Sequence, residues 1–165
     1  MGISEIRLRT SYYLTKKFGK EVRYNSFGPE FGGGEGETII SNKPLWSEGY
    51  MSCCGTILLS DNLASLSHRN SGREQNYKVR EDLKSTLNEM LSIKNNSQIS
   101  GFAAGGSLEH LKQILEGFNE LGIVRIGDGI YHNENCVMGL AVIPRTKNII
   151  LCKANNNSKI NFINI

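Results

Sequence analysis

The sequence predicts an α/β (α+β) fold: one domain, spanning residues 1–165, with a mixed β-sheet or sandwich core and two flanking helices. Two central segments carry apolar residues at helical spacing. Short runs rich in β-branched residues precede, separate and follow them, so the order is strands, helix, strand, helix, strands. A length of 165 residues suits one compact domain.

The first third of the chain predicts two strands joined by a glycine-rich leader. Residues 5–14 alternate polar and apolar side chains, which favours a strand. Residues 26–37 read as a loop, and the N-terminal strand and the glycine-rich leader together occupy residues 1–35. Its Gly32-Gly33-Gly34 run lacks the Lys-Ser/Thr pair of a phosphate-binding loop, so we interpret it as a connector. Residues 37–41 are a short strand.

A β-hairpin is predicted next. Residues 55–60 and 63–68 form two strands around Asp61-Asn62, a pair suited to a tight turn. Residues 69–77 are polar and are predicted to form an exposed loop.

Two helices follow, with a strand between them. The first is indicated by apolar residues at helical spacing: Val79, Leu83, Leu87, Met90 and Leu91. Residues 99–104 are a strand that ends at Gly105-Gly106. Ser107 is a natural N-cap for the second helix, and Gly122 a left-handed C-cap. The apolar residues of that helix are Leu108, Leu111, Leu115, Phe118 and Leu121.

The rest of the chain predicts strands only. They cover residues 123–126, 130–132, 137–143 and 148–152, and residues 160–165 are expected to add a last edge strand.

Composition excludes several classes of function. The net charge of +3 is mild and Lys and Arg are dispersed, so we expect no nucleic-acid partner. No apolar run reaches the roughly 18 residues of a membrane span. The first nine residues lack the uncharged core of a signal peptide, so we expect a cytoplasmic protein, or one secreted without a cleaved signal into a host cell. A monomer is expected.

The four cysteines do not form a disulfide framework in a chain of this size. Cys136 and Cys152 lie in strand-like runs and are interpreted as buried thiols. No CxxC pair is present, so we expect no metal site. Ligation of one ion by Cys53, Cys54, His68 and His132 stays a minor alternative, and His110 and His132 are expected to be structural or solvent-facing.

Cys54 and His68 are the candidate reaction centre. Cys54 opens the first strand of the hairpin and His68 closes the second, so thiol and imidazole could meet across it. Backbone N–H groups from Cys53 to Gly55 could hold an oxyanion, and Gly55 would leave room for a substrate carbonyl. Ser47, Ser52, Ser67 or a main-chain carbonyl could orient His68.

These residues resemble the cysteine-dependent protein glutamine deamidases, a family that includes the chemoreceptor deamidase CheD, the cytotoxic necrotizing factors and Burkholderia lethal factor. Met51-Ser52-Cys53-Cys54 resembles the Leu-Ser-Gly-Cys motif of the toxins, with Cys53 in place of glycine. Several members orient the histidine with a threonine six residues before the cysteine; Glu48 stands there relative to Cys54, and Ser47 is the nearest hydroxyl. Cys53 is the alternative nucleophile if the register shifts by one residue.

The resemblance extends over residues 36–152 and implies a function. Its downstream part is the strand running into Gly105-Gly106, the following helix, Leu121-Gly122-Ile123 and a terminal hairpin. It implies a hydrolase that converts a glutamine of a partner protein to glutamate through a thioester, without a cofactor, in a toxin, an effector or a chemoreceptor-type housekeeping enzyme. We expect Ser52 and Arg69 in substrate-binding loops. A non-catalytic protein-binding module on the same fold is the alternative.

Overall fold

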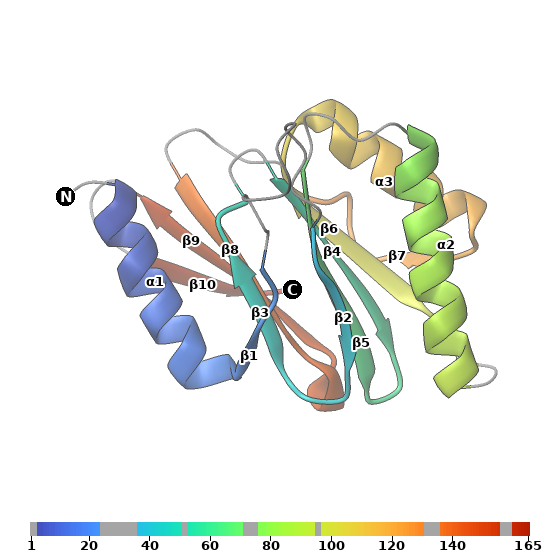
Figure 1. Cartoon of the computed structure of the whole chain (residues 1–165), viewed down its shortest axis with the longest axis horizontal. Coiled ribbons are helices and arrows are strands. Elements are labelled where there is room, and N and C mark those ends of the chain that lie inside the picture. Colours follow the sequence, from blue (N-terminus) through green and yellow to red (C-terminus); the bar gives the residue numbers. More distant parts are fainter. Residues whose placement is uncertain are drawn as a thin grey trace, which may run out of the picture.

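The fold is a sandwich of two β-sheets with helices on both outer faces (Figure 1). The structure is a computed structural model that describes residues 3–23, 36–50, 53–70, 76–94, 97–130, 136–155 and 160–165. In Figure 1 the layers run from α1, through one sheet and then the other, to α2 and α3. No helix among the described residues is long and apolar enough to cross a membrane.

Each sheet has five strands and mixed direction. Sheet I has the order β1 (Lys20–Glu21), β3 (Leu45–Glu48), β8 (Cys136–Ile143), β9 (Asn148–Asn155) and β10 (Ile160–Asn164). Sheet II has the order β2 (Thr38–Ser41), β5 (Leu63–Asn70), β4 (Cys53–Ser60), β6 (Ser100–Gly105) and β7 (Val124–Arg125). One pair in each sheet, β1–β3 and β6–β7, is parallel and the others are antiparallel. The α+β class with mixed sheets is therefore confirmed.

Helices α2 (Asn76–Ile93) and α3 (Leu108–Glu120) cover the outer face of sheet II, as Figure 1 shows. The Ser107 hydroxyl accepts a hydrogen bond from the His110 amide at 3.2 Å, as expected of an N-cap. Gly122 has φ +70°, the left-handed conformation that ends a helix. Both predicted signals of α3 are confirmed. A short 3₁₀ turn, Pro144–Thr146, joins β8 to β9.

The strand predicted over residues 5–14 is wrong, because this segment lies in helix α1 (Ile3–Phe18). Thr10, Leu14 and Phe18 are buried at four-residue spacing against sheet I, which is a helical pattern rather than an alternating one. Gly19, with φ +79°, follows the last helical residue. The described residues therefore form three α-helices rather than the two predicted, and the additional helix packs on sheet I.

Two apolar layers surround sheet II. We call the layer between the sheets the inter-sheet core; it includes Tyr50, Cys53, Ile57, Leu66, Phe102, Leu140 and Leu151. The layer beneath α2 and α3, the helix-side core, includes Cys54, Leu58, Val79, Leu83, Leu111 and Phe118. Successive residues of β4 enter the two layers alternately, as a strand buried on both faces requires.

Candidate active site

The predicted hairpin is confirmed and its register is uninterrupted. Ser60 pairs with Leu63 across the Asp61-Asn62 turn, and Asn62 has φ +60°. At the far end, Gly55 pairs with His68, Cys54 with Arg69 and Cys53 with Asn70. Strand β5 thus continues to Asn70, two residues beyond its predicted end.

This register separates Cys54 from His68. Residues directly opposite each other share a face of the sheet, and neighbours along a strand take opposite faces. His68 stacks on Tyr50 of the inter-sheet core, whereas Cys54 belongs to the helix-side core. The preferred nucleophile and the histidine therefore lie on opposite faces of sheet II.

Cys53 lies on the His68 face. It belongs to the inter-sheet core and is one diagonal step from His68, because Gly55 is the partner of His68 and Cys53 lies two residues before Gly55. Diagonal neighbours of an antiparallel pair are about 7–8 Å apart at the backbone, a separation across which an aromatic side chain such as an imidazole can reach its neighbour. Cys53 and His68 are 5% and 3% exposed.

Ser47 reaches His68 from the opposite sheet. Its hydroxyl lies 2.8 Å from His68 Nδ1, and both side chains are buried. Strand β3 brings it there: Ser47 pairs with Leu140 of β8, and both belong to the side of sheet I that faces the inter-sheet core. Among the four groups predicted to be able to orient His68, Ser47 is the one with an observed hydrogen bond to it. In the tautomer whose Nδ1–H donates to Ser47 Oγ, Nε2 carries the lone pair.

Ser47 stands at different spacings from the two cysteines. Ser47 lies six residues before Cys53, where several members carry the orienting threonine, whereas Glu48 holds that place relative to Cys54. The register of the hairpin places Cys53, and not Cys54, on the face of sheet II that His68 occupies.

Replacing Ser47 by alanine tests this arrangement. We expect Ser47→Ala to lower the reactivity of the site about 10- to 100-fold, because His68 loses the group that sets its tautomer. We expect a cost of about 1–2 kcal/mol in the free energy of unfolding from the lost buried bond. The rate of Cys53 alkylation and chemical denaturation measure the two effects. Ser65→Ala is the control, because it removes a buried hydroxyl of sheet II instead. It should destabilise the protein without changing that rate.

Gly55 has neither of its expected roles. A Cβ on Gly55 would lie 2.6 Å from Leu140 Cδ1 and 2.8 Å from the Tyr50 ring, so its open side is filled by protein. Gly55 pairs with β5 on one side and with β6 on the other. These pairings use the main-chain groups of a central strand in sheet hydrogen bonds. Cys53 is the first residue of β4, and the ladder to β6 begins one residue later, at Cys54–Gly105.

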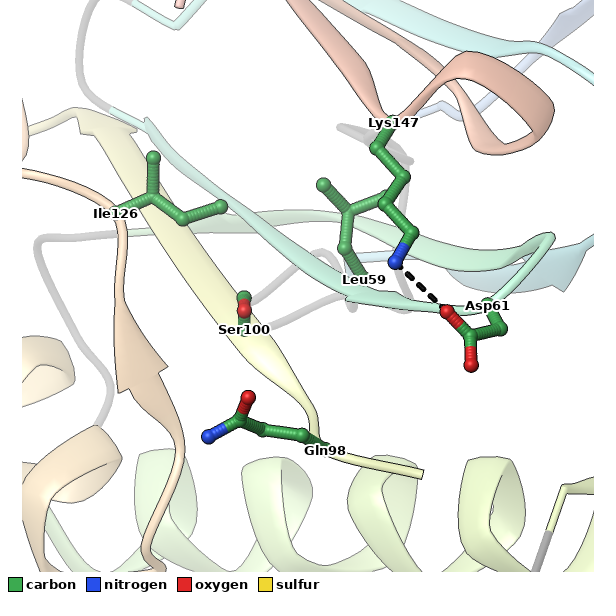
Figure 2. A pocket seen from close by; sticks show the side chains of 6 residues that line it. All are labelled: Leu59, Asp61, Gln98, Ser100, Ile126 and Lys147. Carbon is green, nitrogen blue, oxygen red and sulfur yellow. Dashed lines mark hydrogen bonds and ion pairs between the residues drawn. The ribbon is translucent and has the colours of Figure 1, made fainter.

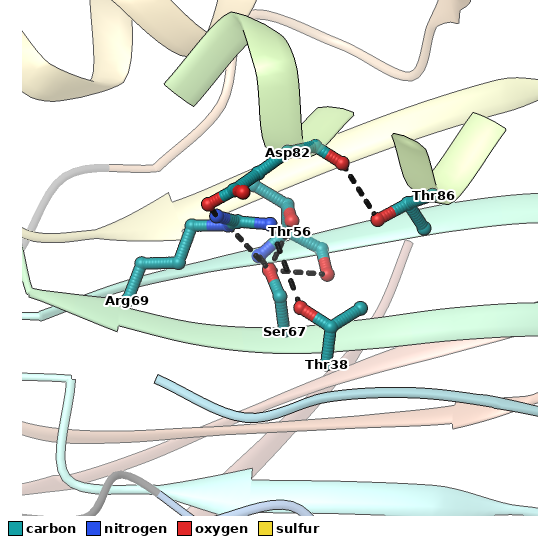
Figure 3. A network of polar contacts seen from close by, with 6 residues as sticks. All are labelled: Thr38, Thr56, Ser67, Arg69, Asp82 and Thr86. Carbon is teal, nitrogen blue, oxygen red and sulfur yellow. Dashed lines mark hydrogen bonds and ion pairs between the residues drawn. The ribbon is translucent and has the colours of Figure 1, made fainter. Parts of the chain in front are cut away.

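Arg69 lies in strand β5 and not in a substrate-binding loop. It is buried on the helix-covered face of sheet II, where it forms an ion pair with Asp82 of α2 (Figure 3). Its guanidinium also donates to Ser67 Oγ at 3.3 Å and to Thr38 Oγ1 at 3.4 Å. Arg69 therefore ties β2, β5 and α2 together. Ser52, the other residue expected in such a loop, lies outside the described residues.

His110 is buried beside this network, in the first turn of α3. Neither ring nitrogen has a hydrogen-bond partner within the described part of the chain. Burial, and next the charge of Arg69, lower the pKa of His110 below its usual value. His110 is therefore buried rather than solvent-facing, and His132 lies outside the described residues.

This burial predicts a pH-dependent stability. Because the unfolded chain binds a proton to His110 at a higher pH than the fold does, stability is full above about pH 6.5 and falls as the pH decreases below it. We expect the melting temperature of His110→Leu to fall less than that of wild type between pH 6.5 and 5. Parallel curves for the two proteins would contradict this.

A cavity of about 340 Å³ lies at the other end of the sandwich (Figure 2). Leu59 and Ile126 line it, with Gln98 and Ser100 on one side and the Asp61–Lys147 ion pair, at 2.7 Å, on the other. Leu59 is six residues along β4 from Cys53, about 20 Å at the rise of a strand. This cavity is therefore separate from the Cys53–His68 cluster.

The described side chains contain no group of three or more His, Cys, Asp or Glu suited to a metal ion. Cys53 and Cys54 enter different cores, which argues against one ion held by both.

Comparison with known proteins gives a distant similarity of fold. No protein-family model matches the chain, and no curated protein matches it. Among solved structures, the C-terminal domain of CNFy from Yersinia pseudotuberculosis is similar, with a TM-score of 0.38 and 13% sequence identity. The match covers 81% of this chain and 59% of that one, so this chain spans about three fifths of the structure it matches. The similarity concerns the fold alone.

Proposed function

We propose that the protein is a cysteine hydrolase that deamidates a glutamine side chain of a partner protein, with Cys53 as nucleophile, His68 as acid and base, and Ser47 as orienting group. The observation that carries the proposal is the 2.8 Å contact between Ser47 and His68 Nδ1, on the face of sheet II that Cys53 shares. A nucleophile, a base and a group that orients the base are the parts that acyl transfer needs. The resemblance of residues 36–152 to glutamine deamidases supplies the substrate class.

The reaction follows from these roles. His68 Nε2 takes the thiol proton, and the thiolate attacks the carboxamide carbon. In this proposal the backbone amide of Cys53, at the start of β4, stabilises the oxyanion. The tetrahedral intermediate collapses as the C–N bond breaks and the imidazolium protonates the departing ammonia, which leaves a thioester on Cys53. His68 then deprotonates water, whose attack releases glutamate and the thiol.

The chemical consequence for the partner is one additional negative charge. Such a change is large enough to switch a catalytic glutamine or an interface that contains it. The proposal includes both expected settings, a toxin-like effector and a housekeeping receptor deamidase, because the reaction is the same in each.

The first experiment is iodoacetamide labelling at neutral pH with peptide mapping. We expect Cys53 to be alkylated at least about 10-fold faster than Cys152, and His68→Ala to remove most of that difference. Equal and slow labelling of both thiols in the wild type would overturn the proposal.

The second experiment tests the glutamine specificity. Wild type and Cys53→Ala are incubated with cell lysate, and proteins are searched by mass spectrometry for conversion of glutamine to glutamate. Sites converted by wild type alone support deamidation. A reactive Cys53 with no such site would leave a thiol hydrolase of another class.

The burial of Cys53 and His68 favours one competing function, a protein-binding module without a reactive thiol. The labelling experiment separates the two functions, since a binding module requires no His68-dependent thiol.

A further inference from the structure

The ring of Tyr50 stacks on the imidazole of His68. The two ring centroids are 4.4 Å apart and the planes are inclined by 29°, a stacked arrangement. Tyr50 lies two residues after β3 and three before Cys53, and it is fully buried in the inter-sheet core. Tyr50 thus lies between Ser47 and Cys53 in the sequence, and its ring packs against the imidazole of His68.

The position of this ring depends on a bare backbone in β4. A Cβ on Gly55 would come within 2.8 Å of Tyr50 Cε1 and Cζ. Gly55 is also the residue directly opposite His68. The space that a side chain at Gly55 would fill is thus occupied by the tyrosine that stacks on His68.

The phenol is not itself suited to proton transfer at neutral pH. Burial is the main cause that raises the pKa of Tyr50 far above its usual value; nearby Cys54, Cys53 and Glu48 raise it further, and the Ser47 hydroxyl opposes the rise. The Tyr50 and Ser47 hydroxyls are close, although they are not aligned as a hydrogen bond. Tyr50 therefore stays neutral and acts through its neighbours.

We propose that Tyr50 is a positioning residue for His68: its ring fixes the plane of the imidazole, so that Nδ1 stays on Ser47 and Nε2 on the side of Cys53. This inference rests on the proposed function for its catalytic meaning. Two contacts at different points hold the ring, the stack on its face and the Ser47 bond at one nitrogen. Either contact alone would leave one rotation of the side chain available.

The test compares Tyr50→Phe with Tyr50→Leu. Phenylalanine keeps the stacked ring, so the rate of Cys53 alkylation should stay within about threefold of wild type; leucine removes the stack, and the rate should fall about 10-fold or more. The pH profile of alkylation in Tyr50→Leu should move toward that of His68→Ala. Phe102→Leu is the matched control, because it truncates another buried ring of the inter-sheet core away from His68.

A second measurement does not depend on catalysis. The His68 ring resonances in NMR spectra should show a ring-current shift and one tautomer in wild type and Tyr50→Phe, and lose both in Tyr50→Leu. A folded Tyr50→Leu with unchanged His68 resonances and an unchanged pH profile would overturn the positioning role. If Cys53 of the wild type is unreactive while these resonances behave as expected, the proposed function fails and the positioning of the ring stands.

Discussion

Cys53→Ala is expected to abolish deamidation, lowering turnover by on the order of 10³-fold or more, whereas Cys54→Ala is expected to stay within about threefold of wild type. The two substitutions differ in their expected effect because Cys53 and Cys54 are neighbours in strand β4, so their side chains lie on opposite faces of sheet II. Only Cys53 shares a face with His68 and Ser47. Loss of the Cys54 sulfur leaves a small void in the helix-side core, with a cost of about 1 kcal/mol in stability.

The measurement is the rate of iodoacetamide labelling in each single variant, followed by turnover on a glutamine site found in lysate. The rapidly labelled thiol should remain in Cys54→Ala and disappear in Cys53→Ala, while both proteins melt cooperatively. The reverse outcome would assign the nucleophile to Cys54 and would require β4 to pair with β5 one residue out of the observed register.

The placement of Cys53 on the face of His68 was within reach of sequence reasoning. A two-residue turn at Asp61-Asn62 pairs Ser60 with Leu63, and counting outward pairs Gly55 with His68. Alternation then places Cys53, and not Cys54, on the histidine face. The preference for Cys54 came from its gapless alignment to the motif before it and to the strand after it, and such an alignment contains no information about the faces of the sheet.

Local sequence signals predicted the helices and strands whose ends they mark. Ser107 and Gly122 delimit α3, and Asp61-Asn62 defines the hairpin, because caps and tight turns are properties of a few adjacent residues. Helix α1 was missed because its polar and apolar residues also alternate, and only packing against sheet I selects the helical pattern. Strand β3 is four residues long and follows Pro44, so it had too little pattern of its own.

The sequence reduced the groups that could orient His68 to four candidates, but it did not identify Ser47 among them. Ser47 and His68 are 21 residues apart and belong to different sheets, so their meeting depends on how the sheets pack. Tyr50 lacked any sequence signal, because an aromatic residue between two strands has no periodic neighbours to indicate its direction.

Gly36→Ala is expected to have the second-largest effect, although Gly36 is far from Cys53 in the sequence. A Cβ on Gly36 would lie 1.6 Å from the carbonyl oxygen of His68 and 2.7 Å from its carbonyl carbon. No rotamer change relieves a contact with backbone, so the segment before β2 or the end of β5 must move. The adjacent bond from the His68 amide to the Glu37 carbonyl, at 2.9 Å, would be strained with it.

We therefore expect Gly36→Ala to lower the free energy of unfolding by about 1–3 kcal/mol, as overpacking does. Because a displacement of about 1 Å at a catalytic group costs up to 100-fold, Cys53 alkylation should slow by about 10- to 100-fold. Gly127→Ala is the control: its Cβ meets nothing within 4 Å, but its φ of +67° imposes strain of about 1–2 kcal/mol. Equal destabilisation with slow alkylation only in Gly36→Ala would show that this backbone contact holds His68 in place. Destabilisation of Gly36→Ala with wild-type alkylation would mean that the segment detaches and the histidine is held by Ser47 and Tyr50 alone.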